Sequence, residues 1–333
     1  MNNYFKKYWL LIVLALINNL PILVICCVRT DKTLTLKGDT TVIDKFVEVD
    51  REYTEEGSFS SIYVISFDHS TLFQNFILKD SVINDIDDMY EGYLHLSDIE
   101  IGQMGKIQHE SSINYALICA YSKAKEVNKD IKFDYKFDHY KIAYYGQGSE
   151  FKIGDKIYGV NDVYAKDDFE TFKELFNNAA STKDGNSEYI VQRNGLTIRI
   201  KNTEANLKIS GYSFYDISDE VFPSYKLKST NVGGPSGGLL QTLSIYNSLV
   251  DEDITKGLKI TGTGTIDAGG KGGKIGGIKQ KIHTANDDNM DIFLCPEENY
   301  EEALAAYNTL KNPKMKLYMV RTFEEALEVL KNA

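Results

Sequence analysis

The longest hydrophobic run in the chain begins at Trp9 and ends at Val28, and no charged residue falls within it. About 20 residues of α-helix rise about 30 Å, which is the thickness of the hydrocarbon core of a bilayer. Pro21 lies inside the run, but transmembrane helices tolerate proline. The pattern therefore predicts that residues 1–30 form a transmembrane anchor and that the membrane is a partner of this segment.

A secretory signal peptide and a lipoprotein signal are the alternatives to an uncleaved anchor. A cleaved signal would have a shorter apolar region and an A-x-A-like site, and neither is seen in this run. A lipoprotein signal would place a small residue before its cysteine, whereas Ile25 precedes Cys26. Basic residues flank both ends of the run, so their count does not decide the orientation across the membrane.

Strand and helix patterns share the middle of the chain. Residues 58–67 (SFSSIYVISF) and 140–145 (YKIAYY) are rich in β-branched and aromatic residues, which predicts strands. Apolar residues recur with a helical period across residues 108–128, which predicts an amphipathic helix. A second helix over residues 169–177 and two strands, EYIVQRNG and LTIRI, follow. This region is therefore predicted to be rich in β-structure with inserted helical elements.

The C-terminal third contains a serine in a glycine-rich turn. Ser236 stands between Gly234-Pro235 and Gly237-Gly238, and a helical apolar stripe begins at Leu239. A serine at such a helix N-terminus is open to a substrate carbonyl, and free backbone N–H groups there can hold an oxyanion. Serine is also a common helix N-cap, and a glycine-flanked serine at this position is usually only structural, so the turn alone does not establish catalysis.

A second glycine-rich segment, residues 258–281, begins as a strand and enters a helix near Gly277. Lys279 falls in the first turn of that helix, where the positive end of the helix dipole disfavours the charged form of lysine. A lysine with a lowered pKa can act as a general base. The alternative is that Lys279 is a solvated surface residue.

Composition and motifs exclude several classes of function. The chain has 333 residues and a net charge of −11, which argues against nucleic acid as a partner. No CxxC pair and no HExxH motif occurs, so neither a zinc ribbon nor a zincin metal site is predicted. The G-x-x-x-x-G-K-S/T motif is also missing, so we expect no ATP site and no cofactor.

The segment KIGDKIYGVNDV, residues 152–163, followed by a helix and by YIVQRNGLTIRI, residues 189–200, resembles a bacterial PDZ domain. The resemblance implies that an extended peptide adds as a strand to a sheet edge. The stretch KFDHYKI stands where a carboxylate-binding loop would be expected, which leaves recognition of C-termini open. The alternative is a β-rich scaffold that binds nothing.

The two C-terminal segments resemble the proteolytic domain of Lon-type serine peptidases through their G-P-S-x-G, T-G-x-x-T and I-G-G-I-K motifs. The resemblance implies that Ser236 is the nucleophile, that Lys279 is the general base and that Thr261 supports the lysine. Backbone groups around Gly234 and Pro235 would hold the oxyanion. The family often has alanine where Gly237 stands.

The order of segments resembles the membrane-anchored, PDZ-containing Lon-like proteases of Gram-positive bacteria. The resemblance implies an α+β multidomain fold with an anchor (1–30), a PDZ-like domain with an N-terminal extension and an inserted helix (38–203) and a Lon-type α/β proteolytic domain (204–333). It implies an ATP-independent serine endopeptidase of the cell membrane, single-pass, with the catalytic domain outside the cytoplasm.

The expected partners are peptides or unfolded proteins, and a homo-oligomer is possible in this family. A catalytically inactive PDZ scaffold for extracytoplasmic partners is the alternative function. An α/β-hydrolase elbow also satisfies G-x-S-x-G at Ser236, but His283 is the only histidine after that serine.

Overall fold

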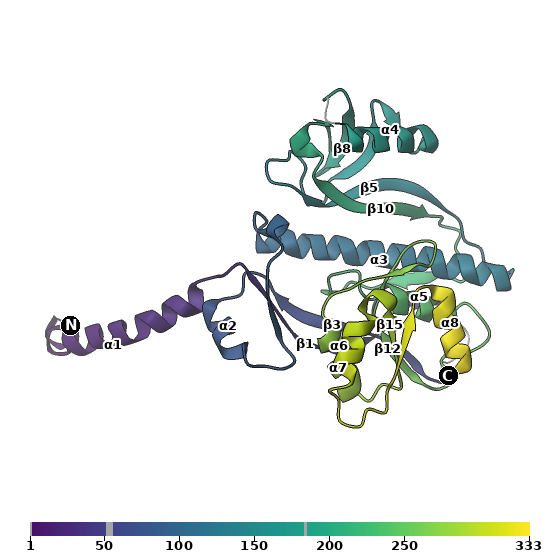
Figure 1. The fold of residues 1–333 in the computed structure, drawn as a ribbon. Helices are drawn as coiled ribbons and strands as arrows, with labels where there is room; N and C mark the ends of the chain where they lie inside the picture. Colours follow the sequence, from purple (N-terminus) through teal and green to yellow (C-terminus); the bar gives the residue numbers. More distant parts are fainter. Residues whose placement is uncertain (1, 51–55, 183–184) are drawn as a thin grey trace.

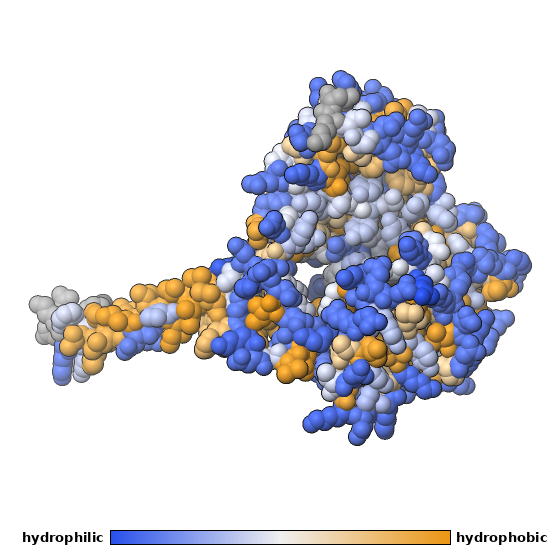
Figure 2. Space-filling view, viewed as in Figure 1, coloured by the Kyte–Doolittle hydropathy of each residue, from blue (hydrophilic) through white to orange (hydrophobic). Residues whose placement is uncertain are grey.

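The computed structural model describes residues 2–50, 56–182 and 185–333 of the chain. It is a mixed α/β structure in which two sheets lie on opposite sides of one long helix, and a separate N-terminal helix projects from the body (Figure 1). That projecting helix is α1 (Asn2–Cys27). Residues 7–27 of α1 have the length and composition that a membrane span and a signal sequence share. The apolar surface of α1 is not covered by the rest of the protein (Figure 2).

The lower sheet has the strand order β16-β15-β12-β3-β1-β4. Its strands are β1 (Lys32–Val42), β3 (Ser58–Phe67), β4 (Asp85–Asp88), β12 (Lys259–Gly262), β15 (Ile292–Pro296) and β16 (Lys316–Val320). Strands β3, β12, β15 and β16 run parallel, whereas β1 and β4 are antiparallel to their neighbours. The parallel strands are buried between helices, as such strands usually are.

Alternate residues of β15 show how the lower sheet is covered on both faces. Phe293 and Cys295 pack into one core with α6 (Ile278–Asp287) and α7 (Tyr300–Tyr307). Ile292 and Leu294 pack into another with α3, α5 (Gly238–Asn247) and α8 (Phe323–Asn332). Two short pairs complete this layer, namely β2 (Val47–Val49) with β11 (Tyr225–Leu227) and β13 (Thr265–Ile266) with β14 (Gly272–Gly273).

Helix α3 (Asp98–Val127) crosses between the two sheets (Figure 1). It begins with a capping box in which Ser97 and Glu100 satisfy each other's backbone N–H groups. Its second half contributes Leu117 and Tyr121 to the core of the lower layer. Its first half packs Met104 and Ile107 against the sheet above. Helix α3 is therefore shared by both layers.

The upper sheet, which we call the inserted unit (residues 135–217), has the order β10-β5-β6-β8-β9, with β7 paired to β6. Its elements are β5 (Tyr135–Tyr145), β6 (Lys156–Val160), β7 (Val163–Tyr164), α4 (Phe169–Ser181), β8 (Glu188–Arg193), β9 (Leu196–Lys201) and β10 (Ile209–Ile217). The chain enters and leaves it side by side, because Lys132 and Phe222 form an antiparallel bridge.

A tight turn at Gly154-Asp155 lies in the inserted unit, just before β6. Gly154 has a φ of +93°, which favours glycine. The buried Asp155 carboxylate accepts from the Lys152 amide at 2.8 Å and from the Arg193 guanidinium at 2.6 and 2.7 Å. Arg193 lies at the end of β8, so this ion pair connects the turn before β6 to the end of β8.

The sheets divide the chain differently from the predicted boundary at residue 203. Strands β1 and β3 lie in the same sheet as β12, although β3 ends at Phe67 and β12 begins only at Lys259. Strand β10 conversely belongs to the upper sheet. The predicted proteolytic domain therefore takes its N-terminal strands from residues 32–67 and gives residues 209–217 to the inserted unit.

Candidate active site

Ser236 is placed by the close approach of helix α3 to the loop that precedes α5. The Gly234 amide donates to the Gly105 carbonyl of α3 at 2.8 Å, and Gly234 has a φ of +87°. A methyl group on Gly233 would lie 3.3 Å from the Gly105 backbone, so only glycine fits this approach comfortably. On the other side, the Ser236 carbonyl accepts from the Gly264 amide at 2.8 Å. Ser236 is half-buried at the start of α5, as the glycine-rich turn predicted.

Lys281 is the residue that approaches Ser236. Its Nζ lies 2.9 Å from the Ser236 Oγ and 2.9 Å from the Thr263 Oγ1. The Thr263 hydroxyl in turn donates to the Ser236 carbonyl at 3.1 Å. The lysine side chain is 1% exposed. Burial lowers the pKa of Lys281 to about 7, so a large part of the population has a neutral amine near neutral pH.

The structure corrects the prediction that Lys279 faces Ser236. Residues two apart on a helix point in nearly opposite directions, so Lys279 and Lys281 cannot both face the serine. Lys279 is partly exposed and forms an ion pair with Asp85 of β4. The I-G-G-I-K motif marked the correct helix but the wrong lysine.

A pattern in the sequence could have identified Lys281. Ile278, Ile282 and Ala285 form the buried stripe of α6, with the spacing i, i+4 and i+7. Lys281 falls at i+3, inside this apolar stripe, whereas Lys279 falls at i+1, outside it. A lysine on the apolar face of an amphipathic helix is expected to be buried, and buried lysines are rare unless they have a polar partner.

The supporting threonine is also shifted by two residues from the prediction. Thr261 is buried, but its hydroxyl donates to the Ser60 carbonyl at 2.9 Å and links β12 to β3. Thr263 lies just beyond the end of β12 and contacts both Lys281 and Ser236. Thr261 therefore holds the sheet together, and Thr263 takes the position expected of the supporting residue.

Gly234 and Pro235 orient the turn, but neither directs an N–H group into the site. The Gly234 amide is engaged by Gly105, and proline has no amide hydrogen. The Pro235 carbonyl accepts from the buried Ser112 hydroxyl of α3 at 3.2 Å. Among the described residues, the amides of Ser236 and Gly237 donate to no acceptor. These two amides are the N–H groups of the turn that could bind an oxyanion.

A cavity of about 410 Å³ opens beside Ser236. One wall is the part of β3 that runs from Ser61 to Val64, where β3 no longer pairs with β12. The opposite wall is the loop that precedes Ser236, together with His109 and Phe46. A segment of extended backbone, Ser61 to Val64, is thus part of the cavity lining.

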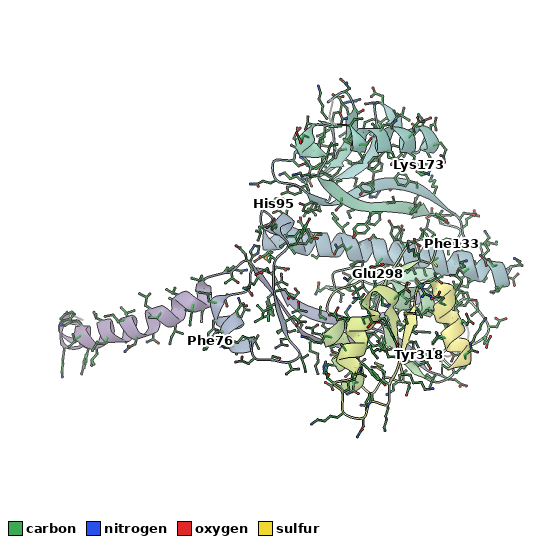
Figure 3. The ribbon with its side chains drawn as sticks, in the orientation of Figure 1. Phe76, His95, Phe133, Lys173, Glu298 and Tyr318 are labelled. Carbon is green, nitrogen blue, oxygen red and sulfur yellow. The ribbon has the colours of Figure 1, made fainter. Side chains whose placement is uncertain are left out.

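A second cavity, of about 680 Å³, lies on the inserted unit between α4 and strands β5 and β10. Phe137, Phe169, Phe172 and Phe176 form an aromatic floor with the rings in contact. Lys136, Lys166 and Lys173 stand at its rim, and Figure 3 shows Lys173 on α4, far from the lower sheet. We call this cavity the α4 groove.

The described part of the chain holds no group of three or more His, Cys, Asp or Glu side chains that could bind a metal ion. The two buried cysteines, Cys119 and Cys295, are free, and burial raises the pKa of both thiols to about 12. These thiols are therefore protonated, which is typical of inert structural cysteines.

The site lies in the part of the chain that is similar to known proteins. Residues 200–333 match the family model of the Lon protease C-terminal proteolytic domain. The Lon protease of Campylobacter jejuni is 28% identical over 137 residues, which are 39% of this chain and 17% of that protein. The Lon protease of Chlamydia pneumoniae is 29% identical over 122 residues, 36% of this chain and 14% of the relative.

A peroxisomal Lon protease homolog 2 from Kluyveromyces lactis is 29% identical over 128 residues, covering 37% of this chain and 13% of that protein. The chain thus spans less than a fifth of the length of the curated relatives that it matches. The similarity supports serine peptidase chemistry for the C-terminal part, which carries Ser236, Thr263 and Lys281.

Proposed function

We propose that the chain is an ATP-independent, membrane-anchored serine endopeptidase in which Ser236 and Lys281 form the catalytic dyad. The observation that carries the proposal is the 2.9 Å approach of a fully buried lysine amine to the Ser236 hydroxyl. Among the described residues, Lys281 has no carboxylate within ion-pairing distance. Desolvation therefore lowers the pKa of the amine, and its neutral form can accept a proton.

The dyad would work by general base and then general acid catalysis. Neutral Lys281 takes the proton of Ser236 as the Oγ attacks the scissile carbonyl carbon. The amides of Ser236 and Gly237 stabilise the oxyanion of the tetrahedral intermediate. The Lys281 ammonium then protonates the leaving amine, the C–N bond breaks, and water hydrolyses the acyl-enzyme by the same two steps.

Thr263 would position Lys281 and hold its charge during the reaction. Its hydroxyl accepts from the lysine Nζ and donates to the Ser236 carbonyl, so it links the two catalytic residues. A hydroxyl stabilises the transient ammonium without the full charge of a carboxylate, which would keep the lysine protonated in the resting enzyme.

The substrates we propose are extended or unfolded protein segments, because the chain has no ATP-binding motif with which to unfold a folded substrate. The α4 groove would bind an apolar or aromatic segment of the substrate, with the rim lysines attracting a carboxylate. The edge of β10 is less suited to pairing with a substrate strand, because the Asn114 side chain of α3 already forms hydrogen bonds with the backbone N–H and C=O groups of Tyr215. We therefore assign substrate binding in the inserted unit to the aromatic floor of the α4 groove.

We propose that α1 anchors the protein in the cell membrane and that the catalytic part lies outside the cytoplasm. Long domains are translocated largely regardless of their charge. A homo-oligomer is compatible with this arrangement.

The test compares three variants of the full chain in detergent, with an unfolded model protein and with a library of quenched fluorescent peptides. Ser236→Ala and Lys281→Ala should each lower kcat/KM by at least about 10³-fold. Lys279→Ala removes a neighbouring lysine of the same helix and should keep most of the activity. Retained activity in Lys281→Ala with loss in Lys279→Ala, in variants with wild-type circular dichroism, would contradict the assignment.

A further inference from the structure

Helix α2 (Leu72–Leu78) has its amphipathic pattern turned outward. Its apolar side chains Leu72, Phe73, Phe76 and Ile77 are exposed, with Phe76 67% and Ile77 54% accessible. Its polar side chains face the protein, since Asn75 bonds the hydroxyls of Ser70 and Thr30. A helix on the water-exposed surface of a globular protein normally has the opposite orientation, with its apolar side facing the protein core.

The exposed face of α2 lies at the end of α1. The Leu72 amide donates to the Val28 carbonyl at 3.1 Å, and the backbones of Arg29 and Thr71 form an isolated antiparallel β-bridge. Figure 1 shows α2 beside the C-terminal end of α1 and running across its axis. A helix that crosses the end of a membrane span lies along the bilayer surface.

We propose that the apolar face of α2, extended by Val82, inserts into the membrane interface beside α1. This inference rests on the proposed role of α1 as an anchor. The occupant of the face is a lipid surface because the face begins next to the end of α1, where the Leu72 amide bonds the Val28 carbonyl and Val28 is 41% exposed. Figure 3 labels Phe76 on α2, near the C-terminal end of α1.

The charges around α2 favour insertion of its apolar face rather than attraction to anionic lipid. Lys79 follows α2 and its Nζ lies 5.1 Å from the centre of the Phe76 ring, a position from which a lysine can reach the headgroups. Asp80 comes next in the chain and offsets this charge. Amphipathic helices with aromatic and leucine side chains on one face bind membranes in this manner.

The contact would orient the catalytic body. A single helix anchor allows the body to swing about the short segment between α1 and β1. A second contact through α2 removes this freedom, because the chain continues from α2 to β4, whose Asp85 bonds Lys279 and Gln280 at the start of α6. The helix that carries Lys281 is thereby connected to the membrane surface by one strand.

The test uses tryptophan fluorescence, since Trp9 in α1 is the one tryptophan of the sequence. The full chain is reconstituted in phosphatidylcholine liposomes, and the same lipid with brominated acyl chains serves as the quencher. The double variant Trp9→Phe/Phe76→Trp should show blue-shifted emission and at least twofold quenching by brominated lipid. The matched control Trp9→Phe/Leu196→Trp places the probe at another exposed site, in the inserted unit, and should stay unquenched with water-like emission.

Wild-type Trp9 reports on the anchor in the same experiment. Quenched Trp9 with an unquenched residue 76 would overturn the docking of α2 and leave the anchor standing. Blue-shifted but unquenched emission from residue 76 would mean that protein, such as a second copy of the chain, covers the face, and would also overturn the proposal. Unquenched Trp9 would overturn the anchor and the docking together. Adding Ile77→Asp to the Phe76→Trp variant should at least halve the quenching.

Discussion

At the scale of residues, two lysines of one helix have opposite environments. Lys279 has a carboxylate partner in Asp85 and contact with solvent. Lys281 has two hydroxyls and no solvent, so its charged form is destabilised. The difference arises from desolvation by the surrounding fold rather than from the helix dipole that both lysines share. A prediction based on the dipole alone could not separate them.

The pH dependence of cleavage follows from the Lys281 pKa of about 7. A general base must be neutral, so activity should rise with pH through about 7 and then level off. The profile of kcat/KM for a short peptide without ionisable groups measures this directly. Lys279→Ala should leave the midpoint within about half a pH unit, because Lys279 is held in an ion pair away from the site. A midpoint near 10 would show that Lys281 is not desolvated in the working enzyme.

Lys281 should also destabilise the folded protein. Its pKa is about 7 when folded and about 10.4 when unfolded, so between these values the unfolded chain binds more protons. Stability should therefore rise with pH from 7 to 10, by up to about 1.4 kcal/mol per pH unit. Lys281→Met should remove this slope and be more stable than wild type at pH 7, by on the order of 2–4 kcal/mol.

Urea denaturation of the detergent-solubilised chain, followed by circular dichroism at pH 7 and pH 9.5, measures the two free energies of unfolding. Lys279→Met serves as the control, because it removes a lysine that is paired and partly exposed. Equal pH slopes in wild type and Lys281→Met would contradict the assignment of the slope to this group.

At the scale of elements, the sequence predicted those strands and helices whose signal lies in neighbouring residues. Strand β3 has the predicted bounds, and the helix after the glycine-rich turn is α5. Helix α3 begins ten residues before the predicted start at residue 108, and these first turns contain two glycines, Gly102 and Gly105, while packing Met104 and Ile107 on the inserted unit. The predicted helix therefore covered only the half of α3 that packs on α5.

Sheet membership could not be predicted in the same way. Pairing of β3 with β12 joins segments that are far apart in the chain, and no residue pattern in either strand specifies the partner. The cavity beside Ser236 depends on this pairing, since β3 forms one of its walls. The candidate serine could thus be recognised from the sequence, whereas the wall that faces it and the lysine that contacts it required the fold.

Close packing of α5 on α3 leads to a prediction for Gly238. A methyl group there would lie 2.9 Å from the Ser112 Oγ and 3.0 Å from the Ile266 amide, which is backbone and cannot rotate away. Gly238→Ala should therefore displace α5, cost about 1–3 kcal/mol of stability and lower kcat/KM more than tenfold. Thermal unfolding and peptide cleavage measure the two effects.

The matched control is Gly237→Ala. A methyl group at this neighbouring position meets first the Ser61 Oγ at 2.8 Å, which is the end of a side chain that can rotate. We expect a stability change below about 1 kcal/mol. A larger effect of Gly237→Ala than of Gly238→Ala would show that the α3–α5 contact does not determine the position of Ser236.

At the scale of the whole molecule, the α4 groove and the Ser236 cavity lie in different layers. If the groove recruits substrate, Lys166→Glu/Lys173→Glu should raise KM for a protein substrate at least about fivefold through charge repulsion of its carboxylates. Cleavage of a short peptide, which reaches only Ser236, should be unchanged. Lys201→Glu alters an exposed charge of the same unit outside the groove and serves as the control. Equal losses on both substrates would instead indicate a structural role for the groove.

The shared helix α3 has a consequence for how the molecule unfolds. Leu117 and Tyr121 belong to the core of the lower layer, and Met104 and Ile107 belong to the contact with the upper layer. Melting of either layer would therefore leave part of α3 without its apolar partners and weaken the helix that the other layer needs. The two layers are thermodynamically coupled through one element, so a lesion in the inserted unit lowers the stability of the layer that holds the active site, even where no catalytic residue is changed.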